Sequence, residues 1–402
     1  MMDSSSEYVF FNAQELKELE SCYEKGGLGR FADKIVQKIN NLSNIELHIA
    51  VTGESGTGKS TFINSMRGLR SKDKDGAKTG TTETTMEPTP YKHPSFPKVC
   101  FWDLPGVGTL KFPVKDYLNK MQFDRYEYFI IISRGRFTEN DANLAKEIKS
   151  MGKKFYFVRT QIDNDLRSLE MEGISFDRNT ELERIRNYST EGLKEAGISN
   201  PIIFLISSFQ VNEFDFPKLK ETLADNLDDI KKDVFLMSLP STTLKIVKQK
   251  ENHLRKRIWM LAIVSGTVGA VPIPGLSFSL DLGILVTAII EFRTCLGLDD
   301  ASLQRLANVT KKRVEFLKAE LKTPLVGEIN EDVLKRILIG SAFFGISAAE
   351  MALDLVPIVG SIFGSVSSFG MTYKLLSNAL NELVVNAQNV VKVAFDIDCN
   401  HP

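Results

Sequence analysis

The stretch of this chain with the clearest chemistry is "GESGTGKSTF" at residues 53–62. Its pattern, Gly-x-x-x-x-Gly-Lys-Ser, is typical of a phosphate-binding loop. The apolar run at 47–51 has the composition of a buried parallel strand, and 59–67 carries apolar residues at helical spacing. A strand, a glycine-rich loop and a helix form the context that such a loop requires. The sequence therefore predicts that backbone amides of this loop bind the phosphates of a nucleotide.

The side chains that end the loop, together with a second motif, predict a site for a nucleoside triphosphate and Mg²⁺. The Lys59 ammonium would reach the β- and γ-phosphates, and the Ser60 hydroxyl would bind the metal ion. The motif "WDLPG" at 102–106 follows a second apolar run. Its Asp103 would hold the same ion, usually through water, and the Gly106 amide would contact the γ-phosphate.

The segment between these two motifs, residues 76–91, is rich in Thr and Gly and poor in apolar side chains. Two interpretations are open: a plain exposed loop, or a switch segment that closes on the γ-phosphate and the metal ion. In the second interpretation, Thr79 and Thr85 are candidate ligands of Mg²⁺. Glu83 is the carboxylate in the middle of the segment.

Asp163, in "TQID" at residues 160–163, is a candidate for guanine recognition. Its carboxylate would accept hydrogen bonds from guanine N1–H and the exocyclic amine, donors that adenine does not present in that arrangement. Gln161 stands where guanine-reading loops normally have a lysine, and its uncharged stem would pack on the base. After a later apolar run, a backbone amide near Ser207 or Ser208 would meet guanine O6.

Apolar strands alternate with helical stretches over residues 45–235, which predicts an α/β domain with a doubly wound, mostly parallel sheet. Ligands of such sheets bind at the carboxyl ends of the strands, where the motifs above fall. The expected nucleotide-binding residues are Gly53, Glu54, Ser55, Gly56, Thr57, Gly58, Lys59, Ser60, Thr61, Gly106, Thr160, Gln161, Asp163, Ser207 and Ser208. The expected metal ligands are Ser60, Thr79, Thr85 and Asp103.

The composition narrows the class of protein. The length of 402 residues favours two domains, and the formal net charge is −1, from 50 basic and 51 acidic residues. Because there is no basic excess, we expect no nucleic-acid partner. The four cysteines and four histidines are scattered along the chain. This pattern suits a reducing compartment such as the cytoplasm and does not predict a zinc site.

Helical patterns replace strands after about residue 236, and two long apolar stretches stand out, at 258–290 and 337–373. Each is longer than the ~20 residues that span a bilayer as a helix, but each is broken by a related Pro-Gly corner. The corners are "VPIPG" at 271–275 and "VPIVG" at 356–360. Three interpretations of these hairpins remain: the core of a helical domain, direct membrane insertion, or an interface between copies.

The motifs together resemble the interferon-inducible immunity-related GTPases, relatives of Ras-like and dynamin-like proteins. The similar stretches are "AVTGESGTGKSTFIN", "AKTGTTETTM", "YKHP", "FWDLPGVGT", "FIIISRGRF", "KKFYFVRT", "FDFPKL" and "GLDDASLQRLA". The resemblance implies a Ras-like GTPase domain at 45–235 that binds GTP or GDP with Mg²⁺. It also implies an all-α helical domain built from both ends of the chain, 1–44 and 236–402.

The same resemblance has implications for catalysis and partners. Lys59 places the chain with the Lys-bearing effector type, and Lys59 and Glu83 become the candidate catalytic residues, Glu83 acting where two GTPase domains face each other. GTP-dependent self-association and action on intracellular membranes in cell-autonomous immunity are implied, with the chain peripheral to or partly inserted in those membranes. Met2 stands where some members carry an acylated glycine.

Two other functions remain compatible with the residues. Val107 follows Gly106, where many small GTPases have a glutamine that orients the attacking water. A regulatory or scaffolding protein that binds GTP or GDP and hydrolyses little is therefore the alternative to a GTPase enzyme. An ATPase is a third interpretation, which Gln161 permits and Asp163 opposes.

Overall fold

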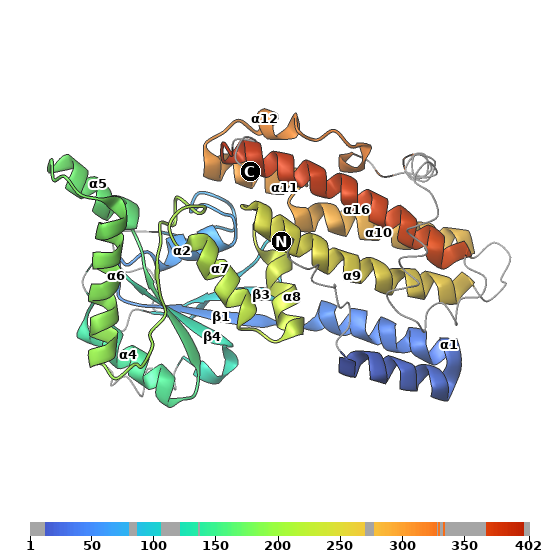
Figure 1. Ribbon diagram of the computed structural model, residues 1–402, viewed down its shortest axis with the longest axis horizontal. Coiled ribbons are helices and arrows are strands. Elements are labelled where there is room, and N and C mark those ends of the chain that lie inside the picture. The colour runs from blue at the N-terminus through green and yellow to red at the C-terminus, as the bar shows by residue number, and fades with distance from the viewer. Residues whose placement is uncertain are drawn as a thin grey trace, which may run out of the picture. The chain divides into compact units, whose positions relative to one another are not determined.

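The computed structural model describes residues 13–79, 87–105, 121–135, 137–269, 277–327, 329, 333 and 367–397. The chain forms two compact units (Figure 1). The first contains the described parts of 1–44, 247–299 and 319–390, and the second those of 45–246, 300–318 and 391–402. Several predicted features lie outside the described residues, namely Glu83, Thr85, Gly106, Val107 and the two Pro-Gly corners at 271–275 and 356–360.

The second unit is built around a sheet with the strand order β2-β3-β1-β4-β5-β6. Its strands are β1 (Leu47–Thr52), β2 (Thr89–Lys92), β3 (Val99–Asp103), β4 (Tyr128–Ser133), β5 (Lys154–Arg159) and β6 (Ile203–Leu205). All neighbouring strands run parallel except β2, which is antiparallel to β3. The order steps outward from β1 in both directions, which confirms the predicted doubly wound, mostly parallel sheet.

The edge strand β2 differs from the sequence-based expectation. The sequence predicts only irregular structure over 76–91, whereas β2 begins at Thr89. Pro90 has no N–H to donate, so it argues against a central strand and is tolerated at an edge. The register pairs Thr89 with Asp103, so the end of the predicted switch segment lies beside a predicted metal ligand.

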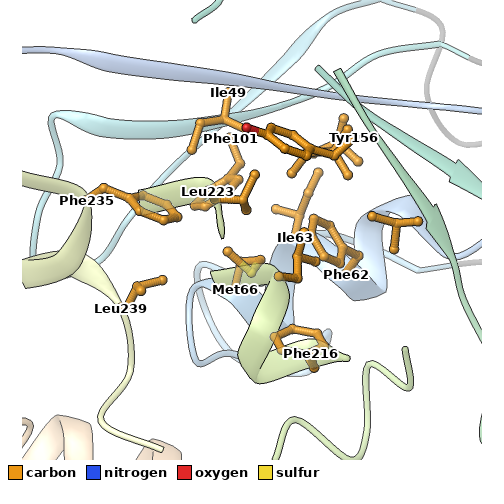
Figure 2. Packing of buried hydrophobic residues seen from close by; sticks show 14 of the residues in the cluster. Ile49, Phe62, Ile63, Met66, Phe101, Tyr156, Phe216, Leu223, Phe235 and Leu239 are labelled. Atoms are coloured by element: carbon orange, nitrogen blue, oxygen red, sulfur yellow. The ribbon is translucent and has the colours of Figure 1, made fainter. Parts of the chain in front are cut away.

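One face of the sheet is covered by α2 (Lys59–Met66), α7 (Phe216–Asp225) and α8 (Asp229–Ser238). Alternate strand residues such as Ile49, Phe101 and Tyr156 point to this face, as strand geometry requires. Figure 2 shows these three side chains packed against Phe62 of α2 and Leu223 of α7. Burial of this cluster fixes α2, and with it the end of the glycine-rich loop, against the sheet.

The other face is covered by α4 (Glu139–Ser150), α5 (Ile162–Met171) and α6 (Arg178–Glu195), which lie on the opposite side of the strands in Figure 1. The intervening strand residues Phe129, Ile131 and Phe157 pack there with Leu144 and Ile162. Except for the edge strand β2, the strands are therefore largely buried on both faces, which explains why they appear in the sequence as continuous apolar runs.

The first unit is helical. Its long helices are α1 (Ala13–Asn44), α9 (Leu244–Gly269), α10 (Ser277–Leu296) and α16 (Ser367–Ala394), of which α9 and α16 extend a few residues into the second unit. Side-chain hydrogen bonds join three of them: Thr372 to Ser265 at 2.9 Å, Arg257 to Glu291 at 2.7 Å, and Arg255 to Asn381 at 2.6 Å. The described residues of this unit form helices and come from both ends of the chain.

A buried lysine donates a hydrogen bond to a backbone carbonyl at the C-terminal end of α10. Lys250 of α9 is 1% exposed, and its Nζ donates to the carbonyl oxygen of Cys295 at 2.6 Å. The last carbonyls of a helix have no partner within the helix, so an external donor stabilises them. Burial lowers the pKa of Lys250.

The part of the first apolar stretch that lies in α9 contributes to a protein core. Ile258, Trp259 and Ile263 of α9 are fully or almost fully buried. Within the described residues, no helix is both long enough and apolar enough to cross a bilayer.

The two units do not follow the predicted domain boundaries throughout. We expect residues 236–402 to form one helical domain, but α11 (Asp300–Thr310), α12 (Val314–Lys318) and the end of the described chain belong to the second unit. Val309 and Phe395 pack against the core cluster of Figure 2. The amine of Lys312 also donates to the carbonyl of Val393 at 2.5 Å.

Candidate nucleotide-binding site

The glycine-rich loop between β1 and α2 has the backbone that its glycines permit. Gly53, Gly56 and Gly58 have φ values of 139°, 78° and 95°, in the region that residues with a Cβ rarely adopt. A Cβ on Gly53 would lie 2.0 Å from the carbonyl oxygen of Ile132 in β4, whereas one on Gly56 would meet nothing within 4 Å. Two independent features therefore require glycine at position 53: its φ value and the close approach of β4.

Lys59, the first residue of α2, extends back across the loop. Its Nζ donates to the carbonyl oxygens of Gly53 and Glu54, at 3.1 and 3.0 Å, and the side chain is only 8% exposed. The ammonium therefore lies within the concave side of the loop, at the positive end of the helix dipole. This position is suited to phosphate oxygens, which could replace the two carbonyls as partners of the ammonium.

Neighbouring elements fix the loop from both sides. The Thr57 hydroxyl donates to the Glu54 carbonyl at 2.8 Å, and the Thr160 hydroxyl, after β5, donates to the Thr57 carbonyl at 2.6 Å. The Glu54 carboxylate accepts from Thr138 at 3.3 Å and Asn140 at 3.0 Å. Glu54 and Thr57, predicted as nucleotide contacts, thus also support the loop through their side chains.

Thr138 and Asn140 were not identified from the sequence. A signal for the local structure was present, because Thr138 and Asp141 form a capping box that starts α4. Asp141 also accepts from Ser133 at the end of β4, and burial raises its pKa. The capping box places the first turn of α4 next to Glu54, but nothing in the spacing along the chain predicts that contact.

Two predicted metal ligands are in direct contact. The Ser60 hydroxyl donates to Oδ2 of Asp103 at 2.7 Å, and Asp103 is fully buried at the end of β3. A hydroxyl and a carboxylate at this distance form a hard oxygen donor set of the kind that Mg²⁺ prefers. Thr79, a third candidate, is exposed.

Asn64 of α2 and Arg67, the residue that caps the C-terminus of α2, hold the chain near both ends of the predicted switch segment, although the sequence did not single them out. The Asn64 amide donates to the carbonyl of Ala77 at 2.8 Å and accepts from its N–H at 2.7 Å. The Arg67 guanidinium donates to the carbonyls of Asp75 at 2.8 Å and Lys92 at 3.0 Å, and burial lowers its pKa. One helix therefore carries Lys59 and Ser60 at its start and holds the flanks of the segment at its end.

The predicted base-reading residues follow a strained turn. Gln161 has a φ of 62° and is the N-cap of α5, which places Asp163 in the first turn of that helix. The turn is held by Arg159, which donates to Asp165 at 2.6 Å and to the carbonyl of Gly135. The cost of a left-handed residue, about 1–2 kcal/mol, is offset by these contacts.

Ser207 and Ser208, after β6, have different roles. Ser207 is fully buried, and its hydroxyl accepts from the N–H groups of Phe209 at 3.2 Å and Gln210 at 3.3 Å. The Ser208 carbonyl accepts from the Ser65 hydroxyl of α2 at 2.6 Å. The side chain of Ser207 therefore shapes the turn, and Ser208 joins the turn to α2.

Asp163 and Ser208 line one cavity of about 1100 Å³ in the second unit. Thr61, Thr79 and Asn164 also line it. The structure thus brings Asp163 and Ser208 together with a residue of α2 that follows the phosphate-binding loop, whereas Gln161 does not line this cavity. The volume is ample for a nucleoside, since ligand sites are commonly about 300–1,000 Å³.

The fold and the site together define a P-loop nucleotide-binding protein with the arrangement of a G domain. A family model described as Interferon-inducible GTPase (IIGP) matches residues 12–392. The chain belongs to the interferon-inducible GTPase family, which confirms the resemblance seen in the sequence. Membership of this family makes it a GTPase and a guanine-nucleotide-binding protein.

Individual relatives are similar over most of the chain. Interferon-inducible GTPase 5 of Rattus norvegicus is 36% identical over 391 residues, which cover 97% of this chain and 84% of that protein. Interferon-inducible GTPase 1 of Mus musculus is 41% identical over 319 residues, 78% of this chain and 76% of that protein. T-cell-specific guanine nucleotide triphosphate-binding protein 2 of Mus musculus is 40% identical over 314 residues, 78% and 75% respectively.

Solved structures show weaker similarity. The G domain of the T. maritima FeoB iron transporter is 19% identical, covers 45% of this chain and 98% of that one, and has a TM-score of 0.27. A GTP-binding protein from Sulfolobus solfataricus, in complex with GDP, is 17% identical, covers 55% and 67%, and has a TM-score of 0.29. These scores are too low to add to the description of the fold.

Proposed function

We propose that the guanine of GTP binds at Asp163, that the triphosphate binds in the loop of residues 53–60, and that the chain hydrolyses GTP to GDP and phosphate. The observation that carries the proposal is the contact of Ser60 with Asp103 beside the buried Lys59. These residues lie at the carboxyl edge of the sheet, as expected for a site that binds phosphates and a metal ion.

Binding of the phosphates follows from the loop geometry. Three glycines with positive φ allow successive N–H groups to turn toward an anion, and α2 adds the partial positive charge of its N-terminus. The Lys59 ammonium would exchange the carbonyls of Gly53 and Glu54 for oxygens of the β- and γ-phosphates. The effect of this charge would be strongest on the transition state, where negative charge spreads over the transferred phosphoryl group.

Mg²⁺ fits the donor set beside the loop. When bound, it would neutralise negative charge on the β- and γ-phosphates. Ser60 and Asp103 would hold it, with Thr79 and Thr85 as further candidate ligands. Asp103 is held in place by the register of β3 with β1 and β2. Glu83 remains a candidate catalytic residue on the strength of the family resemblance alone.

We further propose that GTP drives self-association and that the assembled protein acts on intracellular membranes in immune defence. The support is the family membership together with the length and apolar character of the stretches at 258–290 and 337–373. Light scattering with GTP or GDP tests the first part. Co-sedimentation with liposomes, again with each nucleotide, tests the second, and pellets that do not depend on GTP would contradict it.

Replacement of Asp163 tests the base assignment. Asp163→Asn should exchange the preference for GTP for a preference for xanthosine triphosphate, because the new amide can donate to the extra carbonyl of xanthine. The matched control is Glu170→Gln, since Glu170 is another carboxylate of α5 that lines the same cavity. Calorimetry with both nucleotides measures the preference. An Asp163→Asn variant that keeps the wild-type preference for GTP would contradict the assignment.

Turnover distinguishes an enzyme from a scaffold that binds GTP. Multiple-turnover hydrolysis, measured over a range of protein concentrations, should show a specific activity that rises with concentration if two GTPase domains complete one site. Stoichiometric binding of GTP without turnover at any concentration would instead favour the regulatory or scaffolding alternative.

A further inference from the structure

Phe209 is an exposed aromatic side chain at the base end of the site. It is 71% exposed, yet it lines the same cavity as Asp163 and Ser208. It is not among the residues that the sequence predicts to contact the nucleotide. A single exposed phenylalanine is ordinary on a protein surface, and Phe209 is of interest because it borders a cavity that also holds Asp163.

The backbone of Phe209 is fixed on two sides. Its N–H donates to the buried hydroxyl of Ser207 at 3.2 Å, and the preceding carbonyl, that of Ser208, accepts from Ser65 of α2 at 2.6 Å. The turn therefore holds the ring at a set position relative to both β6 and α2. Holding a side chain on a rigid turn lowers the entropy that a bound partner would otherwise have to remove.

The other two aromatic residues of the cavity wall have their rings engaged elsewhere. Phe176 and Phe214 pack against the core cluster on the α4–α6 face of the sheet. The guanidinium of Arg178 also lies over the ring of Phe214, at 4.8 Å from its centroid. Of the three, Phe209 is the one with an exposed ring available to a ligand.

Gln161 is directed toward the phosphate-binding loop. Its Nε2 lies 3.8 Å from the position of a Cβ on Gly58, and Gln161 is not among the residues that line the cavity. The stem of Gln161 therefore lies beside the phosphate-binding loop and outside the lining of this cavity. Asp163 supplies hydrogen bonds for the edge of a base, which leaves the flat face of the base to be covered by another group.

We propose that Phe209 provides this surface by stacking on the face of the bound purine, while Asp163 binds its edge. Every base has a π-face, so stacking contributes affinity without selecting among purines. The two residues thus have separate roles, because Asp163 determines which base is bound and Phe209 determines how tightly. This inference rests on the proposed guanine site, and GDP binding by the wild type and by a Phe209 variant distinguishes failure of the stacking from failure of that site.

Affinity measurements on the full-length chain test the stacking. Phe209→Ala should weaken the binding of GDP and of inosine diphosphate by the same factor. That factor should be about tenfold to a hundredfold, the usual range for loss of a base–aromatic stack. Phe209→Tyr should restore both affinities. The control is Phe316→Ala, because Phe316 is a phenylalanine of the same unit that is 58% exposed and does not line the cavity. It should bind both nucleotides as the wild type does.

A spectroscopic variant reports contact directly. Phe209→Trp adds a third indole to the two native tryptophans, and its emission should change on saturation with GDP but not with inorganic pyrophosphate, which has no base. A Phe209→Ala variant that binds GDP with wild-type affinity would overturn the inference. This holds even if that variant loses GTP-dependent self-association, because the ring would then contact another copy of the chain and not the base. A wild-type chain with no affinity for GDP would refute the proposed function itself.

Discussion

Replacing Gly53 by alanine tests whether the close approach of the loop to β4 controls the stability of the site. The added Cβ would lie 2.0 Å from the carbonyl oxygen of Ile132, far inside van der Waals contact, and this oxygen is backbone within a central strand. The strand cannot move away without breaking its pairing with β1 or β5. The loop must therefore be displaced instead, and its amides with it.

Gly56→Ala is the matched control, because it has the same chemistry without the collision. Gly56 has a φ of 78°, and an added Cβ would meet nothing within 4 Å. A left-handed alanine costs about 1–2 kcal/mol, partly offset by about 0.4–1 kcal/mol from a less flexible unfolded chain. The control should therefore lose about 1 kcal/mol of unfolding free energy. Gly53→Ala should lose about 1–3 kcal/mol more, the usual cost of overpacking.

Thermal unfolding of the nucleotide-free chain measures the difference. For a unit of this size, each kcal/mol lowers Tm by about 2–4 °C, so Gly53→Ala should unfold several degrees below Gly56→Ala. The transition to follow is the one that GDP shifts upward in the wild type. Equal Tm values for the two variants, with Gly53→Ala still binding GDP at wild-type affinity, would refute the reasoning from the Cβ contact.

Three further changes have defined outcomes. Lys59→Ala should leave the fold intact and weaken GTP binding by about a hundredfold or more, measured by calorimetry, since a buried charged partner of the phosphates is lost; unchanged binding would contradict the site. Asn64→Ala should cost about 1–3 kcal/mol in urea unfolding because it leaves two buried groups of Ala77 without partners, and a loss below about 0.5 kcal/mol would count against this role. Burial lowers the pKa of Lys250 below its usual 10.5, so the unfolded chain binds more protons at this group, and the contribution of Lys250 to wild-type stability should rise with pH up to about 10.5. Relative to wild type, Lys250→Met should lack that rise, and parallel pH profiles of the two proteins would refute it.

Much of the nucleotide-binding unit could be predicted because its signals are local. The apolar runs at 47–51 and 99–103 became central strands, and the loop between β1 and α2 has the positive φ values expected of its glycines. Asp103 and Ser60 were predicted as ligands of one metal ion; the structure has their hydroxyl and carboxylate in contact at 2.7 Å, and the metal site stays a prediction. In each case, the residues that carry the chemistry are adjacent to the element that positions them.

The features that were missed depend on contacts between distant parts of the chain. The pairing of β2 with β3 was hidden by Pro90, which makes the segment look like a turn. The contact of Asn140 with Glu54 joins residues far apart along the chain, as does that of Arg67 with Lys92. Periodicity and motif spacing describe neighbours in sequence, so they do not predict contacts between residues that are far apart along the chain.

The same limit applies to the division into units. The helical character of residues 300–318 was evident, but helical patterns do not indicate which core a helix covers. That choice depends on Val309, which packs against the sheet core together with Phe395.

The position of Phe395 has a consequence for biosynthesis. A ribosome makes the six strands of the sheet well before it reaches residues 391–397, yet Phe395 packs against the core to which the first strand contributes Ile49. Domains usually fold as units during synthesis, from the N-terminus onward. Here the nucleotide-binding unit cannot complete its core until residue 395 has been translated. Nascent chains halted before residue 391 should therefore expose part of that core, and chaperones would be expected to bind them until residues 391–397 have been added.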